Sequence, residues 1–120
     1  MIARIWHGVT TDLNADKYLE YLNRTGLPDY RQTAGNLGAY VLRKIENGKA
    51  HFFTLSFWDS FESIKRFAGK NFDKAKYYPD DATFLLELEP NVQHFELLEQ
   101  PKTPEYVKQY RRSRMLPRWW

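Results

Sequence analysis

AHFFTLSFWDSFESIKRFAG, residues 50–69, contains the pattern that decides the fold. Its first half alternates between two faces, which carry His51, Phe53, Leu55 and Phe57 on one side and Phe52, Thr54, Ser56 and Trp58 on the other. Alternation rich in aromatic residues is typical of a β-strand. The nearly apolar face that includes Leu55 is predicted to lie on the core. The face that includes Thr54 and Ser56 is predicted to form a second, less hydrophobic surface.

A helix is predicted directly after this strand. Asp59 or Ser60 provides a side-chain oxygen that can accept a hydrogen bond from a free backbone N–H of the first turn. Apolar residues from Phe61 to Phe67 then recur at helical spacing, and Gly69 is a suitable end. A strand that leads straight into a capped amphipathic helix is half of a strand-helix-strand unit.

The rest of the chain supplies the other elements of such a fold. Asn47-Gly48 is a strong hairpin signal, because both turn positions favour positive φ. Gly26 and Pro28 are predicted to end the first helix, and 27–33 is either one helical turn or a packed loop. The other predicted elements are strands over 2–9, 37–46, 49–58 and 91–99, the first helix over 13–24, and a short helix over 71–77.

The order strand, helix, two-strand hairpin, helix, strand is that of the ferredoxin-like α+β fold. It predicts a four-stranded antiparallel sheet with both helices on one face. The other face would be bare and rich in aromatic and aliphatic side chains, which is unfavourable for a monomer. A homodimer whose two sheets face each other and enclose a cavity is therefore expected.

Composition divides the chain into two parts. Residues 1–100 form one predicted domain, and 101–120 form a basic, aromatic tail. The net charge is +3, and residues 102–120 carry six basic side chains against one acidic. Apart from this tail, nothing indicates a nucleic-acid or membrane surface. The tail has three open interpretations: an arm that wraps a partner subunit, which we favour, a site for an anionic partner, or a disordered segment.

Several classes of site are not indicated. The chain has no Cys and therefore no disulfide framework or thiolate nucleophile. No run of about eighteen apolar residues predicts a membrane helix, and the first residues lack the pattern of a secretory signal. A cytoplasmic location is the resulting expectation.

At this point the sequence resembles the antibiotic biosynthesis monooxygenase family of dimeric α+β barrels. The resemblance covers about residues 1–99 and rests on MIARIW, RTGLPDYRQTAGNLGAYVLRK, FTLSFWDSFESIKRFAG and KYYPDDATFLLELEP. It implies a small homodimer with a pocket between each sheet and its own helices or loops. Members of this family include cofactor-free oxygenases of aromatic polyketides, haem-degrading enzymes and many proteins of unknown role.

The haem-degrading branch is similar in FWDS, residues 57–60, and then carries a Trp and, ten residues later, an iron-binding His. Here those two positions hold Phe67 and Tyr77. Tyr can ligate ferric haem, so a haem-binding or haem-degrading protein is kept as the weaker alternative. The polyketide-oxidising branch uses Asn, Trp and Arg around a phenolic substrate, and Arg4, Trp6, Trp58 and Tyr77 are available for analogous roles.

The candidate site residues follow from these patterns. Catalytic roles are assigned to Arg4, Tyr77 and His94, and substrate-binding roles to Trp6, Trp58, Phe67 and Tyr78. Arg4 would stabilise an anionic phenolate or enolate while Trp6 stacks on a flat ring. The alternative is that Arg4 and Trp6 anchor the dimer interface. For Tyr77 and Tyr78 the alternative is simple packing beside Pro79.

No metal site is predicted. His7, His51 and His94 lie on three different predicted strands, where two could meet as a metal site or one act as a base. A structural role for His7 and His51 is the favoured interpretation, because nothing places a second ligand, and His94 is the preferred base. Asp80 and Asp81 are expected to cap or solvate their turn.

The function expected is a small-molecule oxygenase that acts on an electron-rich aromatic or quinol-like substrate without a tightly bound cofactor. The alternative is a non-enzymatic dimeric module that binds a hydrophobic ligand or a partner protein.

Overall fold

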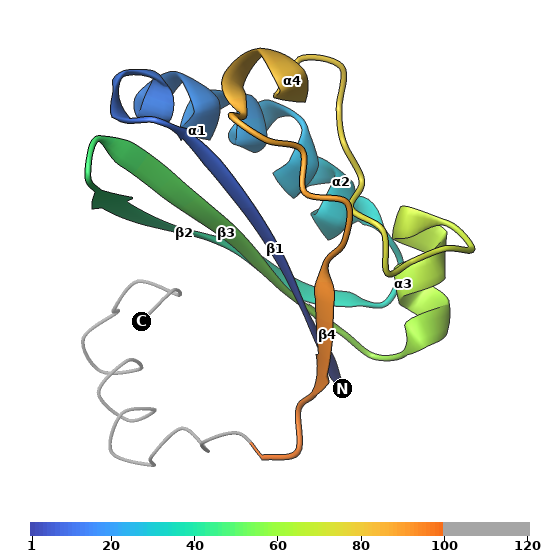
Figure 1. The fold of residues 1–120 in the computed structure, drawn as a ribbon. Helices are drawn as coiled ribbons and strands as arrows, with labels where there is room; N and C mark the ends of the chain where they lie inside the picture. Colours follow the sequence, from blue (N-terminus) through green and yellow to red (C-terminus); the bar gives the residue numbers. More distant parts are fainter. Residues whose placement is uncertain (100–120) are drawn as a thin grey trace, which may run out of the picture.

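A computed structural model describes residues 1–99 of the chain (Figure 1). Its elements are β1 (Ile2–Thr11), the 3₁₀ turn η1 (Asp12–Asn14), α1 (Ala15–Arg24), α2 (Gly26–Gln32), β2 (Asn36–Glu46), β3 (Lys49–Trp58), α3 (Phe61–Ala68), α4 (Asp81–Phe84) and β4 (Gln93–Glu96). The interpretations of the 101–120 tail lie outside the described residues. No helix in the described part of the chain is both long and apolar enough to cross a membrane.

The four strands form one antiparallel sheet in the order β2-β3-β1-β4. This is the ferredoxin-like arrangement predicted from the sequence. Figure 1 shows the helices together on one face of the sheet, while the other face carries no helix. The β2–β3 hairpin turns at Asn47 and Gly48, which have φ of 53° and 73° as predicted.

The decisive strand-to-helix segment has the predicted elements and bounds. The Ser60 side chain accepts a hydrogen bond from the N–H of Ser63, and α3 ends at Gly69 with φ of 89°. The predicted assignment of the two strand faces is wrong. Phe52, Thr54, Ser56 and Trp58 point into the core, whereas the face that includes Phe53 and Leu55 is only half-buried.

Hydrogen bonding explains this reversal. The Thr54 hydroxyl lies 3.0 Å from the Tyr30 hydroxyl, and the Ser56 hydroxyl accepts a hydrogen bond from Nε1 of Trp58 at 2.9 Å. A buried aromatic side chain with a polar group needs such a partner. The hydroxyl groups of β3 therefore serve as hydrogen-bond partners for buried aromatic side chains, and they do not indicate a more polar surface.

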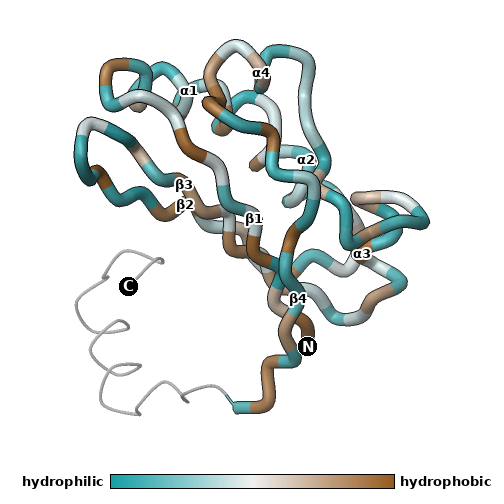
Figure 2. The backbone as a smooth tube through the Cα atoms, viewed as in Figure 1, coloured by the Kyte–Doolittle hydropathy of each residue, from teal (hydrophilic) through white to brown (hydrophobic). Residues whose placement is uncertain are grey.

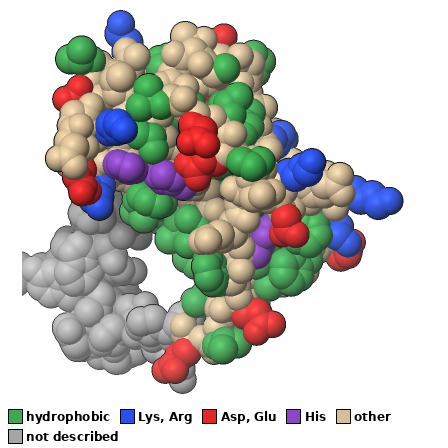
Figure 3. Space-filling model, in the orientation of Figure 1, with side chains coloured by type: hydrophobic (Ala, Val, Ile, Leu, Met, Phe, Trp, Pro, Cys, Tyr) green, Lys and Arg blue, Asp and Glu red, His purple; other side chains and the backbone are tan. Residues whose placement is uncertain are grey.

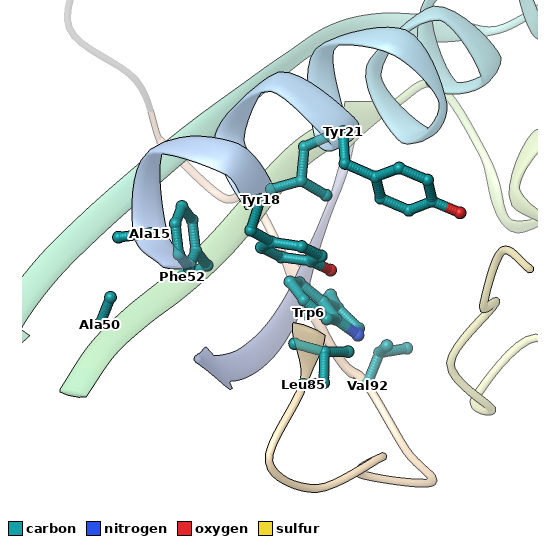
Figure 4. Close-up of a cluster of buried hydrophobic side chains, with 9 residues drawn as sticks. Trp6, Ala15, Tyr18, Tyr21, Ala50, Phe52, Leu85 and Val92 are labelled. Atoms are coloured by element: carbon teal, nitrogen blue, oxygen red, sulfur yellow. The ribbon is translucent and has the colours of Figure 1, made fainter. Parts of the chain in front are cut away.

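Two hydrophobic clusters fill the space between sheet and helices. One, shown in Figure 4, lies under α1 and consists of Trp6, Ala15, Tyr18, Tyr21, Leu22, Ala50, Phe52, Leu85 and Val92. The other lies between α2 and α3 and consists of Ile2, Leu27, Tyr30, Ala39, Trp58, Ile64 and Phe67. Figure 2 shows hydrophobic stretches on β1 and β3, which contribute to both clusters.

The first helix, α1, ends at Arg24, just before Gly26, as predicted. A separate helix, α2, then runs from Gly26 to Gln32, so the segment 27–33 is mostly helical, which is one of its two predicted alternatives. Pro28 is tolerated there, since the first N–H groups of a helix have no partner within that helix. The last strand covers Gln93–Glu96 and is thus shorter than the predicted 91–99.

The predicted helix over 71–77 is absent. The backbone of this segment is instead paired with the chain near residue 91, through hydrogen bonds from Ala75 to Pro90 and from Val92 to Asp73. The carbonyl oxygens of Phe72 and Lys74 also accept hydrogen bonds from the Arg4 guanidinium. These long-range bonds replace the helical ones.

Gly8 provides the space for the Trp6 indole. A Cβ atom at Gly8 would lie 2.4 Å from Cη2 of Trp6 and 2.9 Å from Cδ2 of Leu85. We expect Gly8→Ala to lower the free energy of unfolding by about 1–3 kcal/mol, because the added methyl group overfills the core. Urea unfolding would measure this change.

Gly26→Ala is the matched control. A Cβ atom at Gly26 would meet its nearest neighbours at 3.8 and 3.9 Å, which is ordinary contact. Its stability should equal or exceed that of the wild type. Equal stability of Gly8→Ala and Gly26→Ala would contradict the packing described for Trp6.

Candidate functional site

A small cavity lies between the sheet and the α1–α2 pair. Its volume is about 20 Å³ and its lining consists of Trp6, Tyr18, Leu22, Gly26, Tyr30, Thr54, Lys76, Tyr78 and Asp81. This volume holds one water molecule. The lining combines aromatic rings with a few convergent polar groups, which is the usual character of a small-molecule site.

Of the seven candidate residues, Trp6 and Tyr78 line the cavity. Phe67 and Trp58 lie one layer behind it, since both pack on Tyr30, with ring centroids 4.3 and 6.3 Å from the Tyr30 ring. Tyr77 packs edge-on against Trp6 and donates its hydroxyl hydrogen to the carbonyl of Glu89. Burial raises the pKa of Tyr77.

Arg4 is buried beside this wall, with 1% of its surface exposed. Besides its bonds to the carbonyl oxygens of Phe72 and Lys74, its guanidinium lies 5.6 Å from the centre of the Phe67 ring. Burial lowers the pKa of Arg4, although an Arg side chain stays protonated in proteins. Arg4 and Trp6 thus both face the helices, so the suggestion that they anchor an interface between sheet faces does not fit.

His94 is engaged on both sides of its ring. Nε2 lies 3.0 Å from a guanidinium nitrogen of Arg4, and Nδ1 lies 3.1 Å from Oδ1 of Asp73. Since Arg donates only, Nε2 is the acceptor and Nδ1–H faces Asp73. Burial and then the Arg4 charge lower the pKa of His94. The residue positions Arg4 and does not line the cavity.

Two buried donors have no partner of good hydrogen-bond geometry among the described residues. One is Nε1 of Trp6, which lines the cavity, and the other is Nε of Arg4, which does not. The side chains of Tyr77 and Tyr30 lie close to Trp6 and Arg4, respectively. Figure 4 shows the indole nitrogen of Trp6 and the hydroxyl of Tyr18 on the same side of their rings. A buried donor without an acceptor costs about 1–3 kcal/mol. The arrangement therefore favours a water or ligand oxygen at this place.

Asp81 is the acidic group of the cavity, and it is 3% exposed. It accepts hydrogen bonds from the Tyr18 hydroxyl at 2.8 Å and from the Tyr78 N–H at 2.6 Å. Burial raises the pKa of Asp81 and that of Tyr18. Asp81 caps its turn through the bond from the Tyr78 N–H, as predicted, and the same carboxyl group also reaches the interior through Tyr18, which was not predicted.

The segment from Lys76 to Asp81 closes the cavity against α2. Asp29 on α2 receives hydrogen bonds from Lys76 Nζ at 2.7 Å and from the Tyr78 hydroxyl. Partial burial raises the pKa of Asp29, but the bonds from Lys76 and Tyr78 outweigh this and lower it overall. Burial, followed by the hydrogen bond to Asp29, raises the pKa of Tyr78.

Sequence reasoning missed Tyr18, Tyr30 and Asp81. Tyr18 was predicted as part of the apolar stripe of the first helix, and 27–33 was ambiguous between a turn and a loop. The available signal was the number of tyrosines on the helical stripe, because a buried tyrosine hydroxyl needs a partner.

Solved structures share this fold. Neither a family model nor a curated protein matches the amino-acid sequence. The haem-degrader MhuD from Mycobacterium tuberculosis, with two haems in its active site, aligns at 17% identity over 85% of this chain and 100% of its own, with a TM-score of 0.55. A mutant of MhuD with two manganese protoporphyrin IX molecules per active site gives 16% identity, 86% and 100% coverage and a TM-score of 0.57.

A Bacillus cereus protein provisionally described as an antibiotic biosynthesis monooxygenase aligns at 16% identity. The alignment covers 87% of this chain and 96% of that protein, with a TM-score of 0.56. The fold of residues 1–99 is therefore the one predicted from the resemblance. Identities at this level establish the fold alone, and the chemistry has to be argued from the residues of this chain.

The lowered pKa of His94 predicts a pH effect on stability. The unfolded chain takes up a proton below about pH 6.5, whereas the folded chain resists this protonation. The stability contribution is therefore present above that pH and is lost as the pH falls through the folded pKa. His94→Gln keeps an acceptor for Arg4 and a donor for Asp73 but cannot titrate.

We expect the free energy of unfolding of wild type to fall more steeply than that of His94→Gln as the pH is lowered from 7 to 5. Urea unfolding at several pH values measures the difference, because the two proteins are identical at every other position. Parallel pH profiles would contradict the neutral, doubly bonded state of His94.

Proposed function

We propose that this protein is a small-molecule oxygenase of the antibiotic biosynthesis monooxygenase type, acting on an electron-rich aromatic or quinol-like substrate without a tightly bound cofactor. The observation that carries the proposal is the buried Trp6 Nε1 donor, which lacks a well-aligned acceptor in the lining of an aromatic cavity. The Arg4 guanidinium lies against Phe67, which stacks on the cavity residue Tyr30. A phenolate or enolate oxygen supplies the missing acceptor, and its negative charge is stabilised by Arg4.

The described residues also include a base for such a substrate. Asp81 is held by Tyr18 and by the Tyr78 N–H, and its raised pKa suits a proton acceptor. In the proposed reaction Asp81 takes the phenolic proton, directly or through the Tyr18 hydroxyl. The substrate anion then transfers an electron to dioxygen. The protein contributes burial, orientation and charge stabilisation.

Substrate entry requires the cavity to enlarge, because 20 Å³ is below the few hundred Å³ of a typical ligand pocket. The side chains of Lys76 and Tyr78 are the proposed cover, because both bond to the single carboxylate of Asp29 on α2. Asp80 and Asp81 stay bonded to Tyr21 and Tyr18 on α1, so the proposed base keeps its place when the cover opens.

Oxygen uptake with a panel of quinols and electron-rich phenols tests this function. Trp6→Phe keeps an aromatic ring but removes the N–H, and we expect kcat/KM to fall about 10–100-fold, the value of a hydrogen bond to a charged oxygen. Leu13→Glu is the control, because Leu13 is an exposed residue of η1 that lies outside the cavity lining and outside the bare face of the sheet. Equal activity of Trp6→Phe and wild type would refute the role of the indole N–H.

The same panel of quinols and phenols distinguishes the proposed oxygenase from the non-enzymatic binding module. Ligand binding without oxygen uptake, weakened by Trp6→Phe, would support a binding module. Neither binding nor uptake across the panel would contradict the proposed substrate class.

The described residues do not fit haem. None of the three histidines lines the cavity: His94 is bonded to Arg4 and Asp73, while His7 and His51 lie on the opposite face of the sheet. The Tyr77 hydroxyl donates to the Glu89 carbonyl instead of facing the cavity. The solved haem-bound structures suggest the weaker haem alternative. The described residues of this arrangement, however, offer no axial ligand for the haem iron.

The proposal includes a homodimer. The face of the sheet without helices carries Ile5, Val9, Tyr40, Leu42, Phe53, Leu55, Phe57 and Phe95, as the strand register places them on one side. Several of these are markedly exposed, including Tyr40 at 56% and Leu42 at 51%. An apolar surface of this kind marks an interaction site, and a second copy offers the same complementary surface.

We expect Leu42→Glu to shift the chain from dimer to monomer in sedimentation equilibrium, because the charge would be buried without a partner. Leu13→Glu is the matched control. Leu13 is 89% exposed and lies in η1, outside this face. A monomeric wild type, or a Leu42→Glu variant as dimeric as Leu13→Glu, would contradict the dimer.

A further inference from the structure

His7 and His51 meet on the face of the sheet opposite the helices. His7 lies opposite Phe53 in the β1–β3 register and His51 lies opposite Val9, so the two histidines are diagonal neighbours on one face. Their nitrogens Nε2 and Nδ1 are 3.0 Å apart. Figure 3 shows two histidine side chains in purple side by side, next to acidic groups in red.

The geometry of the pair is that of a shared hydrogen bond. The ring planes are only 13° apart and the ring centres are separated by 5.3 Å. With the nitrogens in contact, this places the rings edge to edge. One of the two nitrogens therefore carries a hydrogen, and the other presents a lone pair.

Glu89 decides which nitrogen of His7 presents its lone pair. Its Oε2 lies 2.6 Å from Nδ1 of His7. A carboxylate can only accept, so Nδ1 of His7 carries the hydrogen and, in the neutral ring, Nε2 holds the lone pair. Metal-binding histidines commonly have this arrangement, with the second nitrogen bonded to a carboxylate that fixes the tautomer and the ring orientation.

We propose that His7 and His51 form a chelating pair for a late transition-metal cation such as Zn²⁺ or Cu²⁺. At a Zn–N distance of about 2.0–2.1 Å, two nitrogens on one ion lie about 2.9–3.4 Å apart, depending on the angle at the metal. The observed separation of 3.0 Å falls in this range. Binding replaces the shared hydrogen bond. An ion about 2.0–2.1 Å from both nitrogens lies beside the line that joins them, so both rings turn toward it, and His51 moves its proton from Nδ1 to Nε2.

The surroundings leave room for the remaining ligands. A hollow of about 370 Å³ adjoins His7 and is lined in part by Asn91 and Gln93. The His7 side chain is 30% exposed, and Phe53 packs on its ring with centroids 4.8 Å apart. No three His, Asp or Glu side chains of residues 1–99 form a complete metal cage. The pair is therefore an open site with two protein ligands, completed by water or a small ligand.

Calorimetric titration of the full chain with Zn²⁺, free of any affinity tag, tests the proposal. We expect one site per chain in wild type. His51→Gln removes a ligand and Glu89→Gln removes the partner that orients His7, which commonly costs 10–100-fold in metal affinity. Glu87→Gln is the matched control, since Glu87 is an exposed neighbour two residues away, and it should bind as wild type does.

Two further arms make the result decisive. Electron paramagnetic resonance of the Cu²⁺-loaded chain should show two coupled nitrogens in wild type and one in His51→Gln. Leu13→Glu, which lies in η1 outside this face, should retain Zn²⁺ binding. Absence of Zn²⁺ binding in wild type, or equal binding by Glu89→Gln and Glu87→Gln, would overturn the chelating pair. If His51→Gln fails to fold, the comparison of the two Glu variants decides.

Discussion

The burial of Arg4 is the constraint on which the rest of the structure depends. A guanidinium with 1% exposure has to find hydrogen-bond acceptors inside the protein. It takes the carbonyl oxygens of Phe72 and Lys74 and the ring nitrogen of His94. These hydrogen bonds hold the segment 71–77, which follows α3, against β1. The carbonyl oxygens of Phe72 and Lys74 are therefore bonded to Arg4 and not to a helix of this segment. The same burial leaves Nε of Arg4 without a well-aligned acceptor beside the aromatic interior.

The sheet has two faces with different tasks. The face under the helices combines large aromatic rings with hydroxyl groups, and nearly every buried polar atom has a partner within the protein. The opposite face is apolar over most of its area and holds the His7–His51–Glu89 cluster. The proposed oxygenase site and the proposed metal pair are therefore on opposite sides of β1, and each can be tested without disturbing the other.

The fold was largely predictable because its signals are local. Alternation, the Ser60 cap, Asn47-Gly48 and Gly69 each follow from side-chain chemistry within a few residues. The segment after α3 was not predictable, because its conformation is set by Arg4 and by the chain near residue 91. The faces of β3 were misassigned because the partners of Thr54 and Ser56 could not be foreseen: Tyr30 lies far along the chain, and the Trp58 indole folds back on its own strand.

The site was predictable only in part, because residue type can be read locally whereas partners far along the chain cannot. Trp6 and Tyr78 were found by their residue types, and both line the cavity. His94 was chosen as a base from its place in the sequence, but its two nitrogens are occupied by Arg4 and Asp73. Asp81 was set aside as a turn residue, and its role depends on Tyr18, which lies 63 residues earlier in the chain.

A high-resolution crystal structure of the chain soaked with a quinol or a phenol analogue tests the central claim most directly. The account predicts ligand density between Trp6, Tyr30 and Tyr78, with an oxygen atom within hydrogen-bond distance of Trp6 Nε1. Density confined to the opposite face of the sheet, with the Trp6 indole nitrogen still lacking an acceptor, would contradict it.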